Sequence, residues 1–203
     1  MYAPSSFRVN DPAALRAMAE AVRFATLVVN GEDGPVAAHL PLVFDGEDLV
    51  GHLARANPLA GLIGPGVPAL AVFVGPSAYV TPSWYASKRE HGKVVPTWNY
   101  LAVQARGRLD PVTDPAALRD VVARLTDVQE AGREMPWAIE DAPEAFILGM
   151  MKGIVGFRLR VTALEGTAKL SQNRPEADRQ GVHDGMAATP KADAQALAAL
   201  MRR

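Results

Sequence analysis

The stretch that decides the fold is Val94-Val-Pro-Thr-Trp-Asn-Tyr-Leu-Ala-Val-Gln-Ala-Arg-Gly-Arg-Leu109. From Tyr100 onward the side chains alternate in character, with Gln104 and Arg106 on one parity and Val103 and Ala105 on the other. A period of two predicts a long β-strand with one apolar face and one face open to solvent or to a ligand.

Shorter strand patterns surround this stretch. They occupy residues 25–29, 35–44, 49–54, 69–74, 154–164 and 168–170, and tight turns rich in Gly and Asp join the first three. Helices are expected at 13–24, 115–129, 143–151 and 176–188, and the first two carry an apolar stripe. Strands that pair through short turns and are rejoined by later strands favour an antiparallel barrel, because regular strand and helix alternation is missing. The predicted class is therefore mainly β with α, with peripheral helices.

The composition is that of an ordinary globular chain. It has 203 residues, of which 49% are hydrophobic and 21% charged, which suits one domain with a substantial core. The formal net charge of -1 argues against a surface that binds polyanions everywhere, although a local basic patch stays open. Such a patch would draw on Arg106, Arg108, Lys152, Arg158, Arg160 and Lys169.

The absence of cysteine narrows the chemistry. Disulfides, thiolate catalysis, zinc-thiolate sites and iron-sulfur clusters are excluded, so any redox chemistry requires a bound cofactor. No apolar run approaches the roughly 20 residues that cross a bilayer, and the first residues lack the pattern of a secretory signal. We therefore expect a cytoplasmic protein without a membrane partner.

Residues 79–100 form a polar and aromatic stretch that a buried core does not require. Aromatic rings offer flat apolar area, while Ser83, Lys88, Thr97 and Asn99 offer hydrogen-bond donors for a ligand. On a strand, Thr97 and Asn99 share one face and Trp98 lies on the other. The alternative interpretation is a ladder of aromatic side chains on an edge strand.

A second polar cluster, Lys169-Leu-Ser-Gln-Asn-Arg-Pro175, precedes a predicted helix. The first N–H groups of a helix are unpaired and favour negative charge, so a phosphate would suit this segment. The alternative is a capped helix start, with Ser171 or Asn173 as the N-cap and Lys169 as a surface charge.

The histidines give no metal site. His39 and His52 lie on adjacent predicted strands, but no third ligand at suitable spacing accompanies them. There is no Gly-x-Ser-x-Gly elbow, no Walker A loop and no dinucleotide glycine fingerprint, which argues against hydrolase and nucleotide-kinase functions. We assign no catalytic residue.

Several long motifs resemble the PaiB family, and the resemblance runs from about Tyr2 to Gly185. The motifs begin at Phe73, Val95, Pro136, Gly153 and Lys169, with the sequences Phe-Val-Gly-Pro-Ser-Ala-Tyr-Val-Thr-Pro-Ser-Trp-Tyr, Val-Pro-Thr-Trp-Asn-Tyr, Pro-Trp, Gly-Ile-Val-Gly and Lys-Leu-Ser-Gln-Asn-Arg-Pro-Glu-Ala-Asp-Arg-Gln-Gly. Two shorter motifs, His39-Leu-Pro41 and His52-Leu-Ala-Arg-Ala-Asn-Pro58, accompany them.

The resemblance implies a split β-barrel of the flavin-reductase and pyridoxamine-phosphate-oxidase type, in a homodimer that binds FMN between its subunits. A single PaiB-like domain would span 1–189, followed by a peripheral helical tail at 190–203. The FMN-binding residues that the resemblance implies are Lys169, Ser171, Gln172, Asn173, Thr97, Trp98, Asn99, Ser83, Lys88 and His52. The first four would contact phosphate and ribityl, and Thr97, Trp98 and Asn99 would flank the ring.

PaiB-like proteins are named as FMN-binding negative transcriptional regulators, so the resemblance also implies a repressor, and a regulator that binds DNA is a second hypothesis beside the FMN-binding protein. No helix-turn-helix spacing is visible in the sequence, because long or proline-marked linkers separate the predicted helices. Two alternatives stay open: a flavin-dependent oxidoreductase of the pyridoxamine-phosphate-oxidase type, and a haem-binding split barrel that uses His39 or His52. The sequence identifies neither a substrate nor an operator.

Overall fold

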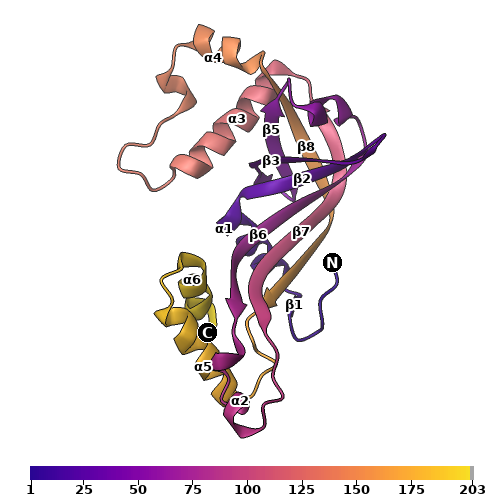
Figure 1. Ribbon diagram of the computed structural model, residues 1–203. Coiled ribbons are helices and arrows are strands. Elements are labelled where there is room, and N and C mark those ends of the chain that lie inside the picture. The colour runs from indigo at the N-terminus through magenta and orange to yellow at the C-terminus, as the bar shows by residue number, and fades with distance from the viewer. Residues whose placement is uncertain (202–203) are drawn as a thin grey trace. The chain divides into compact units, whose positions relative to one another are not determined.

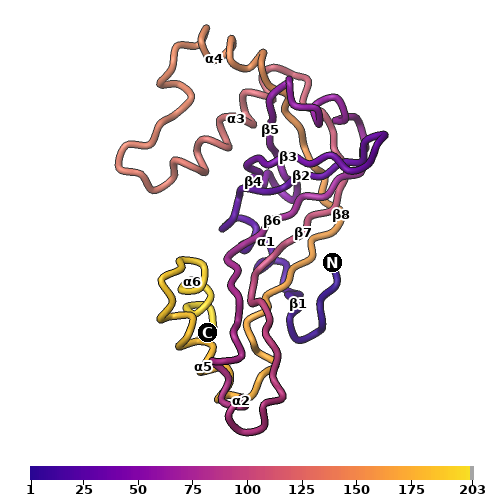
Figure 2. Tube along the Cα trace, in the orientation of Figure 1, coloured from indigo at the N-terminus to yellow at the C-terminus, as the bar shows by residue number. Residues whose placement is uncertain are grey.

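The computed structural model describes residues 1–201, which fall into two compact units. The first unit comprises residues 1–21, 74–103 and the chain from Glu165 onward. The second unit comprises Val22–Phe73 and Gln104–Leu164. Three long strands contribute residues to both units and run side by side in Figure 2: β6 (Val67–Val80), β7 (Thr97–Val112) and β8 (Ile154–Lys169).

The second unit is built on an antiparallel sheet. Its remaining strands are β2 (Phe24–Gly31), β3 (Gly34–Pro41), β4 (Val43–Asp45) and β5 (Asp48–Ala54). The strand order is β3-β2-β6-β7-β8-β5-β4, and the recorded pairings of β2 with β3 and β6, of β4 with β5 and of β5 with β8 are antiparallel. The hairpin and the mainly antiparallel class predicted from the sequence are confirmed.

Gly51 shows how the two ends of this strand order come together. A Cβ atom at Gly51 on β5 would collide with the side chain of Leu42, and it would also meet the Pro41 carbonyl at the end of β3 at 3.1 Å. Glycine at this position suits the close approach of the two strands. The first and last parts of the sheet thus lie against each other, as a barrel requires.

Two helices of the second unit are α3 (Pro115–Glu130) and α4 (Glu144–Met151), shown near β5 and β8 in Figure 1. The start of α3 follows its sequence signature, because the Asp114 side chain accepts the Ala117 N–H at 2.8 Å. Val121 and Leu125 of α3 are buried with Val43 and Val50 of the sheet. The apolar stripe predicted for residues 115–129 therefore faces the core.

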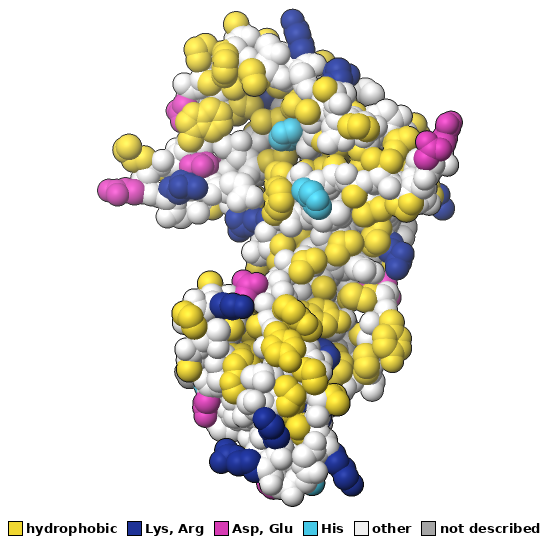
Figure 3. Space-filling view, in the orientation of Figure 1, with side chains coloured by type: hydrophobic (Ala, Val, Ile, Leu, Met, Phe, Trp, Pro, Cys, Tyr) yellow, Lys and Arg dark blue, Asp and Glu magenta, His cyan; other side chains and the backbone are white. Residues whose placement is uncertain are grey.

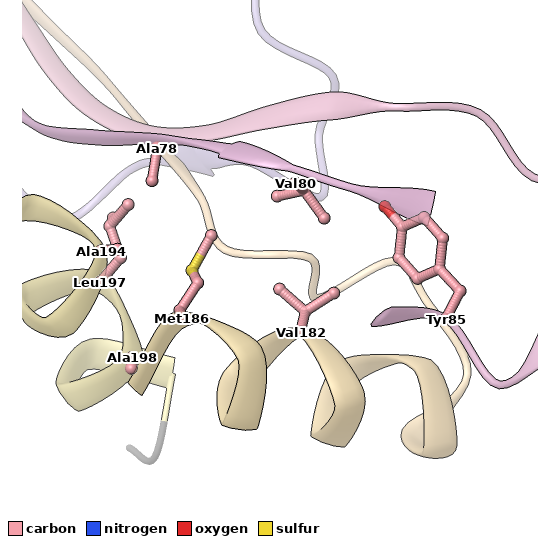
Figure 4. Packing of buried hydrophobic residues seen from close by; sticks show 8 residues of the cluster. All are labelled: Ala78, Val80, Tyr85, Val182, Met186, Ala194, Leu197 and Ala198. Atoms are coloured by element: carbon pink, nitrogen blue, oxygen red, sulfur yellow. The ribbon is translucent and has the colours of Figure 1, made fainter. Parts of the chain in front are cut away.

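The first unit combines strand ends with short and long helices. Its elements are β1 (Arg8–Val9), α1 (Pro12–Val22), a 3₁₀-helix (Pro82–Trp84), α2 (Ser87–Glu90), α5 (Glu176–Ala188) and α6 (Ala192–Met201). Strand β1 pairs with β8 at Thr167 and Gly166, a pairing that the sequence did not predict. Figure 4 shows Val182 and Met186 of α5 directed toward Ala78 and Val80 of β6.

Helix α6 packs more closely than the sequence suggested for a peripheral tail. Its residues Ala194, Leu197 and Ala198 are buried in the same cluster as Val182 and Met186 of α5. The packed face is made mostly of alanine, so it carries little signal in a hydrophobic pattern. The domain boundary expected after residue 189 remains a proposal.

Several strands differ in length from their predictions. Gly75-Pro76 does not end β6, which continues to Val80. Strand β2 pairs with β6 only from Ala69 to Val72, so the missing N–H of Pro76 lies beyond that pairing, where proline is tolerated. Strand β8 likewise runs through the turn predicted at Glu165-Gly166.

Candidate functional site

The two polar segments singled out in the sequence meet in the first unit. Lys169, the last residue of β8, donates from Nζ to the hydroxyl of Thr97 at the start of β7, at 2.6 Å. Two residues further along each segment, Asn99 Nδ2 and Ser171 Oγ lie 3.0 Å apart. These side chains come together because β7 and β8 are neighbours in the strand order.

Ser171 and Asn99 form a buried pair. Asn99 is fully buried and Ser171 is 3% exposed, and the Ser171 hydroxyl also lies 3.2 Å from Asn99 Oδ1. Ser171 has a φ of 61°, a left-handed conformation that few residues other than glycine adopt. The pair therefore holds the chain in a turn immediately before α5.

Lys169 and Arg174 form the positive part of this site. Burial lowers the pKa of Lys169, and the nearby Arg174 guanidinium lowers it further. The Lys169 ammonium lies 5.6 Å from the centre of the Phe7 ring, and the Arg174 guanidinium lies 5.0 Å from that of Tyr85. Within residues 1–201 neither cation pairs with a carboxylate.

Tyr85 supplies a buried hydroxyl next to Arg174. Its side chain is 1% exposed, and its hydroxyl has no hydrogen-bond partner within the described part of the chain. Burial raises the pKa of Tyr85, and the neighbouring Arg174 guanidinium opposes part of that rise. Figure 4 shows its ring at the edge of the cluster that includes Val80 and Val182. A buried polar group without a partner is costly, so it marks a position that a ligand could satisfy.

The aromatic loop between β6 and β7 is fixed to α5 at two points. Asp178 is 2% exposed and accepts the Ser87 N–H at 2.9 Å and the Ser87 hydroxyl at 2.8 Å. A Cβ atom at Gly181 would collide with the Trp84 carbonyl, and one at Gly185 would collide with the Trp84 ring. The two glycines, one helical turn apart, form the surface on which Trp84 lies.

The other predicted contact residues of the first unit are exposed. Lys88 Nζ donates to Ser83 Oγ at 3.2 Å, and Asn173 follows the buried turn. Gln172 binds main chain on both sides, accepting the Leu170 N–H at 2.7 Å and donating to the Ala168 carbonyl at 2.6 Å. Trp98 is 54% exposed and meets Tyr79 edge to face, with ring centres 6.1 Å apart.

His52 differs from the other predicted contacts because it belongs to the second unit, on β5. Its Nδ1 is buried without a hydrogen-bond partner among residues 1–201, and burial lowers its pKa. His39 on β3 lies 3.0 Å from the Thr26 hydroxyl through Nδ1. Nine of the ten predicted contacts thus lie in the first unit, and His52 does not.

Sequence reasoning missed Tyr85 and Asp178 as parts of this arrangement, and it named Arg174 only as one member of a polar cluster. Asp178 looked like an ordinary acidic residue of a first helical turn, and Tyr85 was one of several aromatics in its loop. Their importance lies in contacts with residues about 90 positions away. The described residues contain no cluster of three or more His, Cys, Asp or Glu side chains that could hold a metal, and among them no helix is long and apolar enough to span a bilayer.

The fold defines a class of protein, the split β-barrel. Solved structures with this fold include the FAD and haem binding protein from Mycobacterium smegmatis, with a TM-score of 0.63 and 16% identity, covering 88% of this chain and 80% of that one. They also include the flavocytochrome Anf3 from Azotobacter vinelandii, with a TM-score of 0.59 and 13% identity, covering 80% of this chain and 69% of that one.

The chain belongs to the PaiB-type family described as "Putative FMN-binding domain", whose model matches residues 1–163. It is 32% identical to the protease synthase and sporulation protein PAI 2 of Bacillus subtilis, over 99% of this chain and 96% of that protein. The resemblance inferred from the sequence is confirmed, and FMN is the cofactor that the family indicates.

Proposed function

We propose that this chain is an FMN-binding protein whose phosphate-binding groups are Lys169 and Arg174. The observation that carries the proposal is the pair of neighbouring cations, which no carboxylate neutralises within residues 1–201. Like charges held together repel each other, and a phosphate dianion relieves that repulsion through charge-assisted hydrogen bonds. Helix α5 begins at Glu176, two residues after Arg174, and its first N–H groups favour the same charge.

The other residues of the site fit a flavin. Gln172 and Asn173 are exposed beside the cations and offer amide groups to phosphate and ribityl hydroxyls. Trp98 lies on the opposite face of β7 from Thr97, and its exposed ring offers a flat apolar surface to an isoalloxazine there. The buried hydroxyl of Tyr85 has no hydrogen-bond partner among residues 1–201, and a ligand oxygen could provide one.

In this proposal the remaining predicted residues position the binding groups or lie at the edge of the site. Asn99 and Ser171 hold the turn that places Lys169 and Arg174, while Ser83 and Lys88 lie at the exposed edge of the aromatic loop. The proposal includes a cytoplasmic homodimer in which residues of a second copy, His52 among them, complete the site. Bound FMN would supply electron or hydride transfer, which leaves the oxidoreductase alternative open.

Comparing FMN with riboflavin tests the phosphate assignment, since the two differ only by the phosphate. We expect flavin-free protein to quench FMN fluorescence on binding and to prefer FMN over riboflavin. Lys169→Gln and Arg174→Gln should each reduce that preference by about tenfold or more, because a hydrogen bond to a charged group contributes about 1.5–3 kcal/mol. Lys191→Gln, an exposed change between α5 and α6, should leave the preference unchanged.

Equal affinity for FMN and riboflavin in the unmodified protein would refute the phosphate assignment. Failure to bind either flavin, seen as neither quenching nor a thermal shift, would refute the whole proposal. Sedimentation of the flavin-loaded protein tests the homodimer.

A regulatory role is the second candidate, and one observation favours it. Helices α5 and α6 are joined by three residues, a connection as short as that of a helix-turn-helix. Their exposed positions include Glu176, Asp184 and Asp193, however, and such acidic faces are unsuited to phosphate backbones. Two arginines of the expected basic patch are also paired, Arg158 with Asp45 and Asp48, and Arg160 with Asp110.

We therefore propose that any repression acts through a partner protein rather than through insertion of α5 or α6 into DNA. Retention of a DNA duplex at moderate salt with a sequence preference would contradict this, whereas binding that vanishes with modest salt would agree with it.

The haem alternative depends on His52, whose buried Nδ1 lacks a partner in the described chain. A Soret band after haem addition that His52→Ala abolishes would establish it.

A further inference from the structure

The second unit contains an open cavity of about 570 Å³ between the start of α3, helix α4 and β8. Its walls are mainly apolar, formed by side chains such as Val112, Leu118, Leu148 and Met151. This volume lies within the range of about 300–1,000 Å³ typical of small-molecule sites, which combine apolar walls with few polar groups.

The charged groups of this cavity are two cations, Arg55 and Lys152. The Arg55 side chain is fixed by main-chain carbonyls, with Nε 3.0 Å from the Lys152 oxygen and Nη2 2.9 Å from that of Ile154. The Arg55 N–H also donates to the Gly153 carbonyl at 2.8 Å. Within residues 1–201 neither Arg55 nor Lys152 pairs with a carboxylate, so their charge is available to a ligand.

A neighbouring cavity of about 540 Å³ in the same unit shows the opposite arrangement. Its arginines are already neutralised, since Arg158 lies 2.5 Å and Arg124 lies 2.8 Å from carboxylate oxygens of Asp45. Asp120 and Asp127 add further negative charge to its walls. The cavity under α4 thus differs in combining unmatched positive charge with apolar walls.

Helix α4 gives the cavity an apolar rim. Figure 3 shows apolar side chains gathered over this helix, and Phe146, Leu148 and Met150 are all exposed. Leu148 lines the cavity and is 45% exposed, whereas Met150 is 60% exposed and does not line it. Exposed apolar surface beside a cavity favours a ligand with an apolar body.

We propose that this cavity binds a small amphipathic anion, a carboxylate or sulfonate carried on an aromatic or branched aliphatic body. The acid group binds between Arg55 and Lys152, and the body packs on Leu118, Leu148 and Met151. The Arg55 guanidinium is already held in position by main-chain carbonyls, so it loses little conformational freedom when it binds the anion. This inference is independent of flavin binding, because every residue that it uses belongs to the second unit.

A matched pair of probes tests it on the full-length, flavin-free protein. Anilinonaphthalene sulfonate carries the anion, and N-phenylnaphthylamine has the same ring system without it. We expect both probes to bind with enhanced fluorescence, and Arg55→Gln and Lys152→Gln to weaken the sulfonate about tenfold while leaving the neutral probe unchanged. Equal losses for both probes would overturn the anion assignment.

A second pair of variants tests the location. Leu148→Trp should fill the cavity and abolish sulfonate binding, whereas Met150→Trp, on the same helix but outside the cavity, should preserve it. Sulfonate binding that survives Leu148→Trp, in a variant whose thermal unfolding matches that of Met150→Trp, would overturn the location. Calorimetry with FMN-saturated protein separates this inference from the proposed function, because displacement of the sulfonate by FMN would refute a separate site.

Discussion

The buried carboxylate of Asp178 accepts both the main-chain N–H and the hydroxyl of Ser87, at 2.9 and 2.8 Å. This relationship joins the start of α2 in the aromatic loop to the first turn of α5, two segments about 90 residues apart. The loop that carries Trp84 and Tyr85 is thereby held against the helix that follows Lys169 and Arg174. The stability of the first unit and the position of the aromatic loop beside these two cations therefore depend on the same contact.

Removing the charge of Asp178 should destabilise the first unit. An amide in Asp178→Asn has one acceptor oxygen, so one donor of Ser87 is left without a partner in a buried place, at a cost of about 1–3 kcal/mol. The free energy of unfolding measured in urea tests this. Glu176→Gln, on an exposed position of the same helix, should change that free energy by no more than about 0.5 kcal/mol. Equal effects of the two changes would contradict the role given to Asp178.

Replacing Gly181 and replacing Gly149 with alanine should change the stability of the protein in opposite directions. A Cβ atom at Gly181 collides with the Trp84 carbonyl, so Gly181→Ala should cost about 1–3 kcal/mol despite the higher helix propensity of alanine. Gly149 in α4 has open space around the added atom, and Gly149→Ala should stabilise the protein by up to about 1 kcal/mol. Thermal unfolding of both variants measures the difference, and a stabilising Gly181→Ala would refute the Trp84 contact.

The preference for FMN over riboflavin should fall on the alkaline side, at a pH below the ordinary lysine pKa of 10.5. Burial and Arg174 lower the pKa of Lys169 from its ordinary 10.5, so its charge is lost earlier on the alkaline side. Bound phosphate opposes this loss of charge. Measuring riboflavin binding at the same pH values corrects for titration of the isoalloxazine ring, which both ligands share. Lys169→Arg should keep the preference constant over the same range, because an arginine does not titrate there. An equally steep decline in both proteins would exclude Lys169 as the titrating group.

Acidification should destabilise the protein partly through His52. Its pKa in the folded protein lies below the ordinary 6.5 because burial disfavours the charged ring. The unfolded chain therefore binds more protons than the folded one as the pH falls. The contribution of His52 to the free energy of unfolding is fully present above pH 6.5 and is lost as the pH falls through the lowered pKa of the folded protein. His52→Gln should flatten this decline in urea unfolding, whereas His91→Gln, in an exposed loop, should not.

Much of the fold could be predicted from local patterns. The alternation from Tyr100 to Leu109 identified β7, and the Asp-Pro signature at Asp114 identified the start of α3. Strand ends were harder to place, because β6 passes through Gly75-Pro76 where its pairing with β2 has stopped. Whether a proline ends a strand depends on the neighbouring strand, which local sequence does not reveal.

For the site, the sequence alone determined which chemical groups are available. It identified the two segments rich in donors and cations, the lack of thiol chemistry and the family to which the chain belongs. Only the tertiary structure decided that Lys169 bonds to Thr97, that Asn99 and Ser171 are buried against each other, and that Tyr85 lies under Arg174. These relationships arise because the ends of β7 and β8 are neighbours and α5 packs on the aromatic loop. Burial and orientation are properties of such distant contacts, so a linear sequence names the groups but does not show which of them are left free for a ligand.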